Sequence, residues 1–101
     1  MAMTLEELTF DVMQPLIGTS FRLAVEGRDD IELKVTDVCK VMERSKRLTR
    51  QPFSIYFAGP RDVLVKQGTY RLRHEQLGEM SIFIVPVAQA AGGFEYEAVF
   101  T

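Results

Sequence analysis

From Ser20 onward, apolar and polar residues alternate along most of the chain, with short interruptions that contain glycine or paired acids. This period of two is typical of β-strands with one buried face, because successive side chains of a strand point to opposite sides. Asp37-Val38 disturbs the rhythm and indicates a β-bulge, and Gly59-Pro60 and Gly92-Gly93 predict turns. Six strands are predicted in all, at residues 20–26, 31–36, 53–58, 69–74, 80–87 and 94–100.

The first twenty residues follow a different pattern. Apolar residues recur at helical spacing, and Thr4 with Glu7 forms a capping box, in which each side chain bonds the backbone N–H of the other residue. Pro15 follows and would end a helix. We therefore expect a short helix from about Leu5 to Met13 that closes one end of the sheet.

The fold class is predicted to be mainly β, in a single domain that comprises residues 1–101. Six strands with one buried face and mostly short connections predict an antiparallel meander that forms a small barrel or a two-layer sandwich. The segment 80–87 is apolar on both faces, so we expect it to be the most buried strand.

Four charges share the alternating spacing of two predicted strands. Arg71 and Arg73 stand on one strand, and Glu95 and Glu97 stand on the last one. If these strands are neighbours, the four side chains would form cross-strand ion pairs.

The composition excludes several classes of protein. With 47% hydrophobic and 26% charged residues the chain is globular, and no apolar run is long enough to span a bilayer. The first residues show no signal peptide, and the single cysteine, Cys39, cannot form an internal disulfide. These features predict a cytoplasmic protein without membrane contact.

Catalytic chemistry has few candidates in this sequence. His74 is the single histidine, so a thiol dyad would have to join it to Cys39, which is distant in sequence and lacks a nucleophile motif. Metal-ligand spacing and a phosphate-binding loop are also missing, so we expect no enzyme, no metal and no cofactor. His74 ends a predicted strand, and we expect it to bond a turn carbonyl rather than a ligand.

A basic cluster interrupts the otherwise acidic chain. The segment 42–51 has no apolar period, so an exposed loop or a hairpin tip is predicted there. Exposed cations can contact phosphates, but the net charge of −2 and the lack of interleaved aromatic residues disfavour nucleic acid. We expect the cluster to face solvent or an acidic protein partner. Its members are Lys40, Arg44, Lys46, Arg47 and Arg50.

Several short motifs together resemble an uncharacterised family of small bacterial domains of unknown function, over nearly the whole chain. This resemblance implies a bacterial source and the company of phage-tail-like proteins, and it supplies no activity. The motifs are Pro52-Phe53-Ser54, Gly59-Pro60, Gln67-Gly68-Thr69-Tyr70, His74-Glu75-Gln76-Leu77-Gly78 and Tyr96-Glu97-Ala98-Val99-Phe100.

Two functions remain open at this point. The first is a non-enzymatic interaction or structural accessory domain, which contacts an unknown protein or a second copy of itself. The alternative is a small barrel that binds a small molecule or a glycan in its mouth, with Tyr56, Tyr70 and His74 as the candidate lining.

Overall fold

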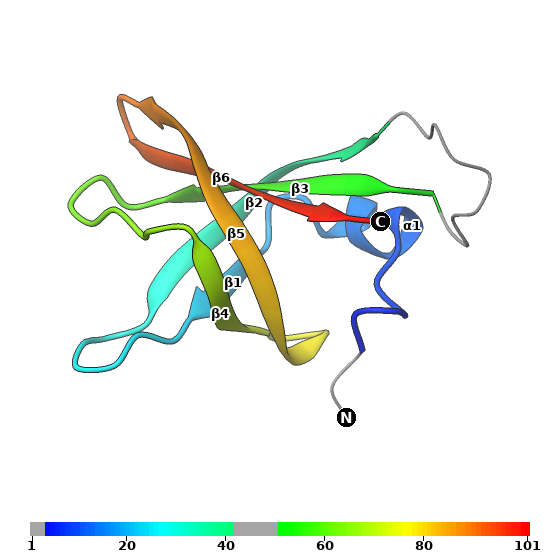
Figure 1. Cartoon of the computed structure of the whole chain (residues 1–101), viewed down its shortest axis with the longest axis horizontal. Coiled ribbons are helices and arrows are strands. Elements are labelled where there is room, and N and C mark those ends of the chain that lie inside the picture. The colour runs from blue at the N-terminus through cyan, green and yellow to red at the C-terminus, as the bar shows by residue number, and fades with distance from the viewer. Residues whose placement is uncertain (1–3, 42–50) are drawn as a thin grey trace.

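The computed structural model describes residues 4–41 and 51–101, which form six antiparallel strands and a short helical segment (Figure 1). The strands close into a barrel in the order β1-β2-β3-β6-β5-β4, in which β4 pairs with β1. The mainly β class and the barrel are thereby confirmed. The strands are β1 (Ser20–Leu23), β2 (Ile31–Lys40), β3 (Phe53–Gly59), β4 (Gly68–His74), β5 (Gly78–Ala90) and β6 (Gly93–Phe100).

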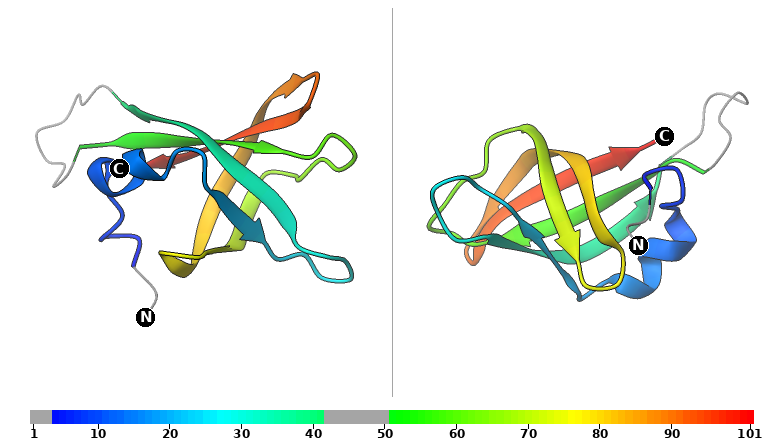
Figure 2. Two further views of the ribbon diagram at one scale, coloured as in Figure 1. Left: turned by 180° about the vertical axis from the view of Figure 1, so that it is seen from behind. Right: turned by 90° about the horizontal axis from the view of Figure 1, so that it is seen from below.

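The strand order shows two meanders where the sequence predicts a single one. β1, β2 and β3 form one three-stranded meander, and β4, β5 and β6 form another. The connection 60–67 joins the two halves, and the pairs β3–β6 and β1–β4 close the barrel between them (Figures 1 and 2). Pairing between strands so far apart in sequence cannot be read from local alternation.

The same order overturns the predicted ion pairs of Arg71 and Arg73 with Glu95 and Glu97. β5 lies between β4 and β6, so the two strands that carry these charges are not neighbours. Both arginines instead approach Glu79 of β5, at 3.4 Å and 3.5 Å. All three side chains are partly or largely exposed, so each ion pair contributes about 0–1 kcal/mol.

The core lies inside the barrel and is built from the inward-facing positions of all six strands. Aromatic rings contact one another within it: Phe21 meets Phe57 edge to face with ring centroids 5.6 Å apart, and Phe53 stacks on Phe100 at 5.0 Å. Full burial of an apolar side chain of this size contributes about 1.5–3 kcal/mol. The interior is therefore occupied by side chains that stabilise the fold.

β5 is not the most buried strand, contrary to the prediction. Met80, Ile82 and Ile84 point inward and are buried, whereas Phe83 and Val87 are 51% and 46% exposed. The most buried strand is β3, whose residues are all buried or partly buried. Apolar residues on the second face of β5 lie on the outside of the barrel.

Two bulges adjust the ladders of hydrogen bonds. The register between β2 and β3 shifts between Val35 and Asp37, next to the predicted position, and Asp37 Oδ1 accepts the N–H of Val38 at 2.9 Å. The register between β5 and β6 shifts between Pro86 and Ala88. Proline has no N–H to donate to the ladder, so a long strand tolerates Pro86 at a bulge.

The helical segment is shorter than predicted. α1 spans Phe10–Met13 and continues into the 3₁₀ helix η1 (Gln14–Leu16). The capping box does form, with the N–H of Thr4 on Glu7 Oε1 at 3.0 Å and the N–H of Glu7 on Thr4 Oγ1 at 3.3 Å, but it closes a turn ahead of the helix. Thr9 caps α1 itself. The segment lies at one end of the barrel (Figure 2) and buries Leu8, Met13 and Leu16.

Candidate functional site

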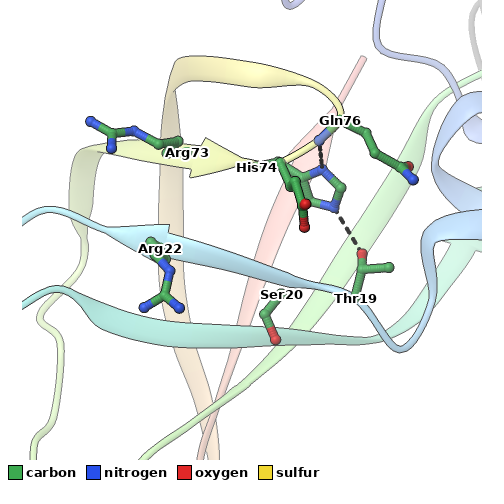
Figure 3. Close-up of a pocket in the computed structure, with 7 residues that line it drawn as sticks. Thr19, Ser20, Arg22, Arg73, His74 and Gln76 are labelled. Atoms are coloured by element: carbon green, nitrogen blue, oxygen red, sulfur yellow. Dashed lines mark hydrogen bonds between the residues drawn. The ribbon is translucent and has the colours of Figure 1, made fainter.

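A surface hollow of about 570 Å³ lies where β1 pairs with β4, beside the turn that leads into β5 (Figure 3). Its polar lining makes it the natural place to look for chemistry. The lining residues are Thr19, Ser20, Arg22, Arg73, His74, Glu75 and Gln76.

The protein itself engages both ring nitrogens of His74, which is 3% exposed. Nδ1 accepts the N–H of Gln76 at 3.0 Å, and Nε2 lies 2.8 Å from Thr19 Oγ1 (Figure 3). The Thr19 hydroxyl donates its one proton to the carbonyl of Leu16 at 2.6 Å, so Nε2 carries the proton of the ring and donates it to Thr19. This arrangement requires a neutral ring. Burial lowers the pKa of His74, and the charge of Glu75 opposes this in part.

These contacts place His74 in the turn-fixing role predicted from the sequence, with one difference. The ring accepts an N–H of the turn and does not donate to a turn carbonyl. Through Thr19 it also ties the β4–β5 turn to the end of η1 and the start of β1. The structure thus favours a structural role for His74 over ligand binding.

Arg22 and Arg73 are direct cross-strand partners, although like charges in this position repel each other. Figure 3 shows their side chains extending in different directions, and neither points toward the ring of His74. Arg73 reaches Glu79 at 3.5 Å, and the partner of Arg22 on β2 is Glu32. Each arginine therefore has an acid on the neighbouring strand that lies away from the other arginine. The two guanidinium groups do not converge on a common point in the hollow.

Cys39 and His74 do not form a dyad. Cys39 lies on β2 opposite Ser54 of β3, and its Sγ donates to Asp37 Oδ2 at 3.3 Å. This hydrogen bond raises the pKa of the Cys39 thiol, and burial and the charges of Asp37 and Glu97 act in the same direction. A thiol that keeps its proton is a poor nucleophile.

The structure does not bring Tyr56, Tyr70 and His74 into one pocket. Tyr56 lies on β3 and donates its hydroxyl to Glu97 at 3.0 Å, a bond that raises the pKa of this tyrosine together with burial. Tyr70 donates to the carbonyl of Lys66 at 2.7 Å and lines a separate hollow of about 250 Å³. His74 lines the hollow between β1 and β4.

Lys40 is the one member of the predicted basic cluster that lies within the described residues. It stands at the end of β2, and its Nζ lies 5.0 Å from the centroid of the Phe10 ring, a cation–π contact between β2 and α1. The other members lie outside the described residues, so the basic surface stays a prediction. They are Arg44, Lys46, Arg47 and Arg50.

An exposed apolar surface on β5 and β6 was not predicted from the sequence. Leu5, Phe83 and Val99 line one hollow of about 210 Å³ and are 41%, 51% and 58% exposed. We call these three residues the Phe83 surface. Phe83 and Val99 stand at outward positions of their strands, where a polar residue is usual. That signal is present in the sequence, but alternation alone does not tell which face of an apolar strand points outward.

The sequence profile of DUF6916, described as a domain of unknown function, matches residues 8–100. The chain belongs to this family. The family resemblance predicted from the motifs is thereby confirmed. Comparisons with curated proteins and with solved structures gave no match. The DUF6916 match covers all six strands, and with them Phe83 and Val99, while Leu5 precedes it.

In residues 4–41 and 51–101, no helix is long and apolar enough to cross a membrane. The same residues hold no group of three or more His, Cys, Asp or Glu side chains placed to bind a metal ion.

Proposed function

We propose that this DUF6916 domain works by contact with a protein, and that the Phe83 surface is the contact site. The observation that carries the proposal is the exposure of three large apolar side chains around a single hollow. Contiguous apolar surface on a folded domain commonly marks an interaction site, because its burial against a partner removes it from water. Phenylalanine is also enriched at the centres of protein interfaces.

The state of the candidate catalytic groups supports a role in contact rather than in catalysis. Asp37 favours the protonated form of Cys39, and both ring nitrogens of His74 are bonded within the fold. A nucleophile and a base would need to lie within hydrogen-bond reach of each other. Here each of the two groups has other partners.

The small-molecule or glycan barrel has less support. Its three candidate residues lie in separate places, and large side chains such as Phe21, Phe57 and Tyr96 occupy the barrel interior. The bacterial source, the cytoplasmic location and the link to phage-tail-like assemblies stay predictions.

Site-specific photocrosslinking in cells of the source organism tests the contact site. The variant Phe83→p-benzoylphenylalanine places a photoreactive ring at the centre of the surface. The same substitution at Leu64 is a matched control, because Leu64 is also 51% exposed but lies in the connection between β3 and β4. We expect protein adducts from position 83 and few from position 64. Equal yields at both positions, or none at position 83, would contradict the proposal.

A further inference from the structure

The Phe83 surface has a basic side on β4. Thr69 of β4 is the direct partner of Phe83, and the next residues with the same orientation along β4 are Arg71 and Arg73. Both arginine side chains are 68% exposed. They share the carboxylate of Glu79, so two positive charges and one negative charge leave this side with a net charge of +1.

The surface has an acidic side on β6. Val99 adjoins Phe83 in their common hollow, and the next residues with the same orientation along β6 are Glu97 and Glu95. Glu97 is the partner of Val85, which lies further along β5 than Phe83. The two glutamates give this side a net charge of −2.

The two charged sides are arranged almost symmetrically about Phe83. The partner of Arg71 on β5 is Ser81, two residues before Phe83, and the partner of Glu97 is Val85, two residues after it. The basic and acidic sides therefore lie diagonally across Phe83, on different neighbouring strands and toward different ends of β5.

Such a surface is complementary to itself. A two-fold axis that passes beside Phe83, in the plane between two facing copies, exchanges the positions of Arg71 and Glu97. Arg71 of each copy then faces Glu97 of the other, and the two Phe83 rings meet at the centre. A two-fold interface requires this kind of self-complementarity, and the opposed charges select the orientation that keeps like charges apart.

We infer that the partner at the Phe83 surface is a second copy of this chain, bound in a two-fold symmetric dimer. This inference rests on the proposed function and names its partner. Phe83 and Val99 form the apolar centre, and Arg71 and Arg73 of one copy pair with Glu97 and Glu95 of the other. These arginines and glutamates stand on strands that are not neighbours in one molecule, and the dimer brings them together.

Sedimentation equilibrium across a wide concentration range provides the first test. The wild-type chain is expected to dimerise, and Phe83→Ser is expected to raise the dimer dissociation constant at least about tenfold, as loss of a central interface residue does. Leu64→Ser should leave the constant unchanged, because Leu64 is equally exposed but lines a different hollow. Circular dichroism confirms that each variant is folded. A monomeric wild type, or a Phe83→Ser chain that dimerises normally, overturns the inference.

A charge exchange provides the sharper test. Arg71→Glu gives a copy with acids on both sides of Phe83, and Glu97→Arg gives a copy with cations on both sides. Each variant alone should dimerise about tenfold more weakly, whereas their mixture should form a one-to-one heterodimer with near wild-type affinity. Because Glu97 also accepts the Tyr56 hydroxyl, the pair Arg73→Glu and Glu95→Arg repeats the test if Glu97→Arg does not fold. A mixture that stays as weak as its components overturns the charge pairing.

The outcomes separate this inference from the proposed function. Adducts from position 83 with the mass of two chains support the dimer. Adducts of position 83 with a different protein, together with a monomeric wild type, overturn the dimer but uphold a contact site at Phe83. If position 83 gives no adducts and the wild type is monomeric, both are overturned.

Discussion

The hydroxyl oxygen of Tyr96 accepts a hydrogen bond from the backbone N–H of Val65 at 2.9 Å, in the interior of the domain. Tyr96 is fully buried on β6, and Val65 belongs to the connection 60–67 that joins the two halves of the barrel. This segment has no strand partner in the sheet, so the tyrosine takes the place of a ladder neighbour for the N–H of Val65.

Tyr96→Phe should therefore lower the free energy of unfolding by about 1–3 kcal/mol, because it leaves a buried N–H without an acceptor. Urea denaturation measures the loss. Tyr70→Phe is the matched control: it also removes a hydroxyl bonded to the backbone, but at an exposed position where water can replace it. An equal loss in both variants would show that the Val65 contact has no special weight.

Gly93 begins β6 with φ of +150°, and a Cβ at this position would collide with the backbone carbonyl of Gly59. Gly93→Ala should destabilise the domain by about 2–4 kcal/mol, since backbone strain and steric overlap add to each other. Gly92→Ala changes the neighbouring turn residue, around which there is open space, and should have little effect. Unfolding by heat or urea distinguishes the two, and similar stabilities would refute the close approach of Gly93 to Gly59.

The stability of the domain should fall as the pH drops below about 6.5, the ordinary pKa of histidine in an unfolded chain. Burial lowers the pKa of His74 in the folded state, so in this range the unfolded chain binds more protons than the folded one. Protonation of Nδ1 would also abolish the bond from Gln76. This contribution is complete above the unfolded pKa and is lost as the pH falls toward the folded pKa.

Urea denaturation between about pH 5 and pH 8 measures this dependence above the range of ordinary carboxylates. His74→Gln should be less stable than the wild type at pH 8, and its stability should change less with pH over the same interval. If the variant keeps the full wild-type slope, groups other than His74 cause the dependence.

Alkylation of Cys39 by iodoacetamide near pH 8 should be slower than that of a free thiol, because Asp37 raises its pKa. Asp37→Asn removes the charge but keeps a side-chain oxygen for the N–H of Val38, and it should accelerate the reaction about several-fold. The rate in urea provides the reference for an unprotected thiol. If Asp37→Asn does not react faster than the wild type, limited access to Cys39, and not its raised pKa, is the cause of the slow reaction.

The strands of this domain could be predicted from sequence because alternation is a local property. The six predicted segments overlap the six observed strands, and the bulge next to Asp37 lies where the pattern indicates it. The last turn is at Ala91-Gly92, one residue before the predicted Gly92-Gly93, because Gly93 already pairs with Ala90. The helix was harder to place. Thr4 and Glu7 make the expected bonds, yet Thr9 is the residue that caps α1, and local signals do not decide between two possible starts.

The candidate site depends on contacts between distant parts of the chain, which local alternation does not reveal. Phe83 and Val85 are apolar, as residues of a strand buried on both faces would be. Whether the second face of β5 is covered depends on elements far away in the chain. The pairing of β4 with β1, which brings His74 to Thr19, is equally nonlocal. Tyr56 and Tyr70 are equivalent in sequence as aromatic strand residues, but the barrel gives their hydroxyls different partners, Glu97 and the carbonyl of Lys66.

The two three-stranded halves are joined by one covalent link, residues 60–67. Cleavage of this link would leave two complete sheets, held together by the β1–β4 and β3–β6 ladders and by the shared core. The domain is thus suited to reconstitution from two separately produced fragments, one ending and one beginning within the link. A cut on the N-terminal side of Val65 would leave Val65 and Tyr96 of β6 on the same fragment and keep their contact.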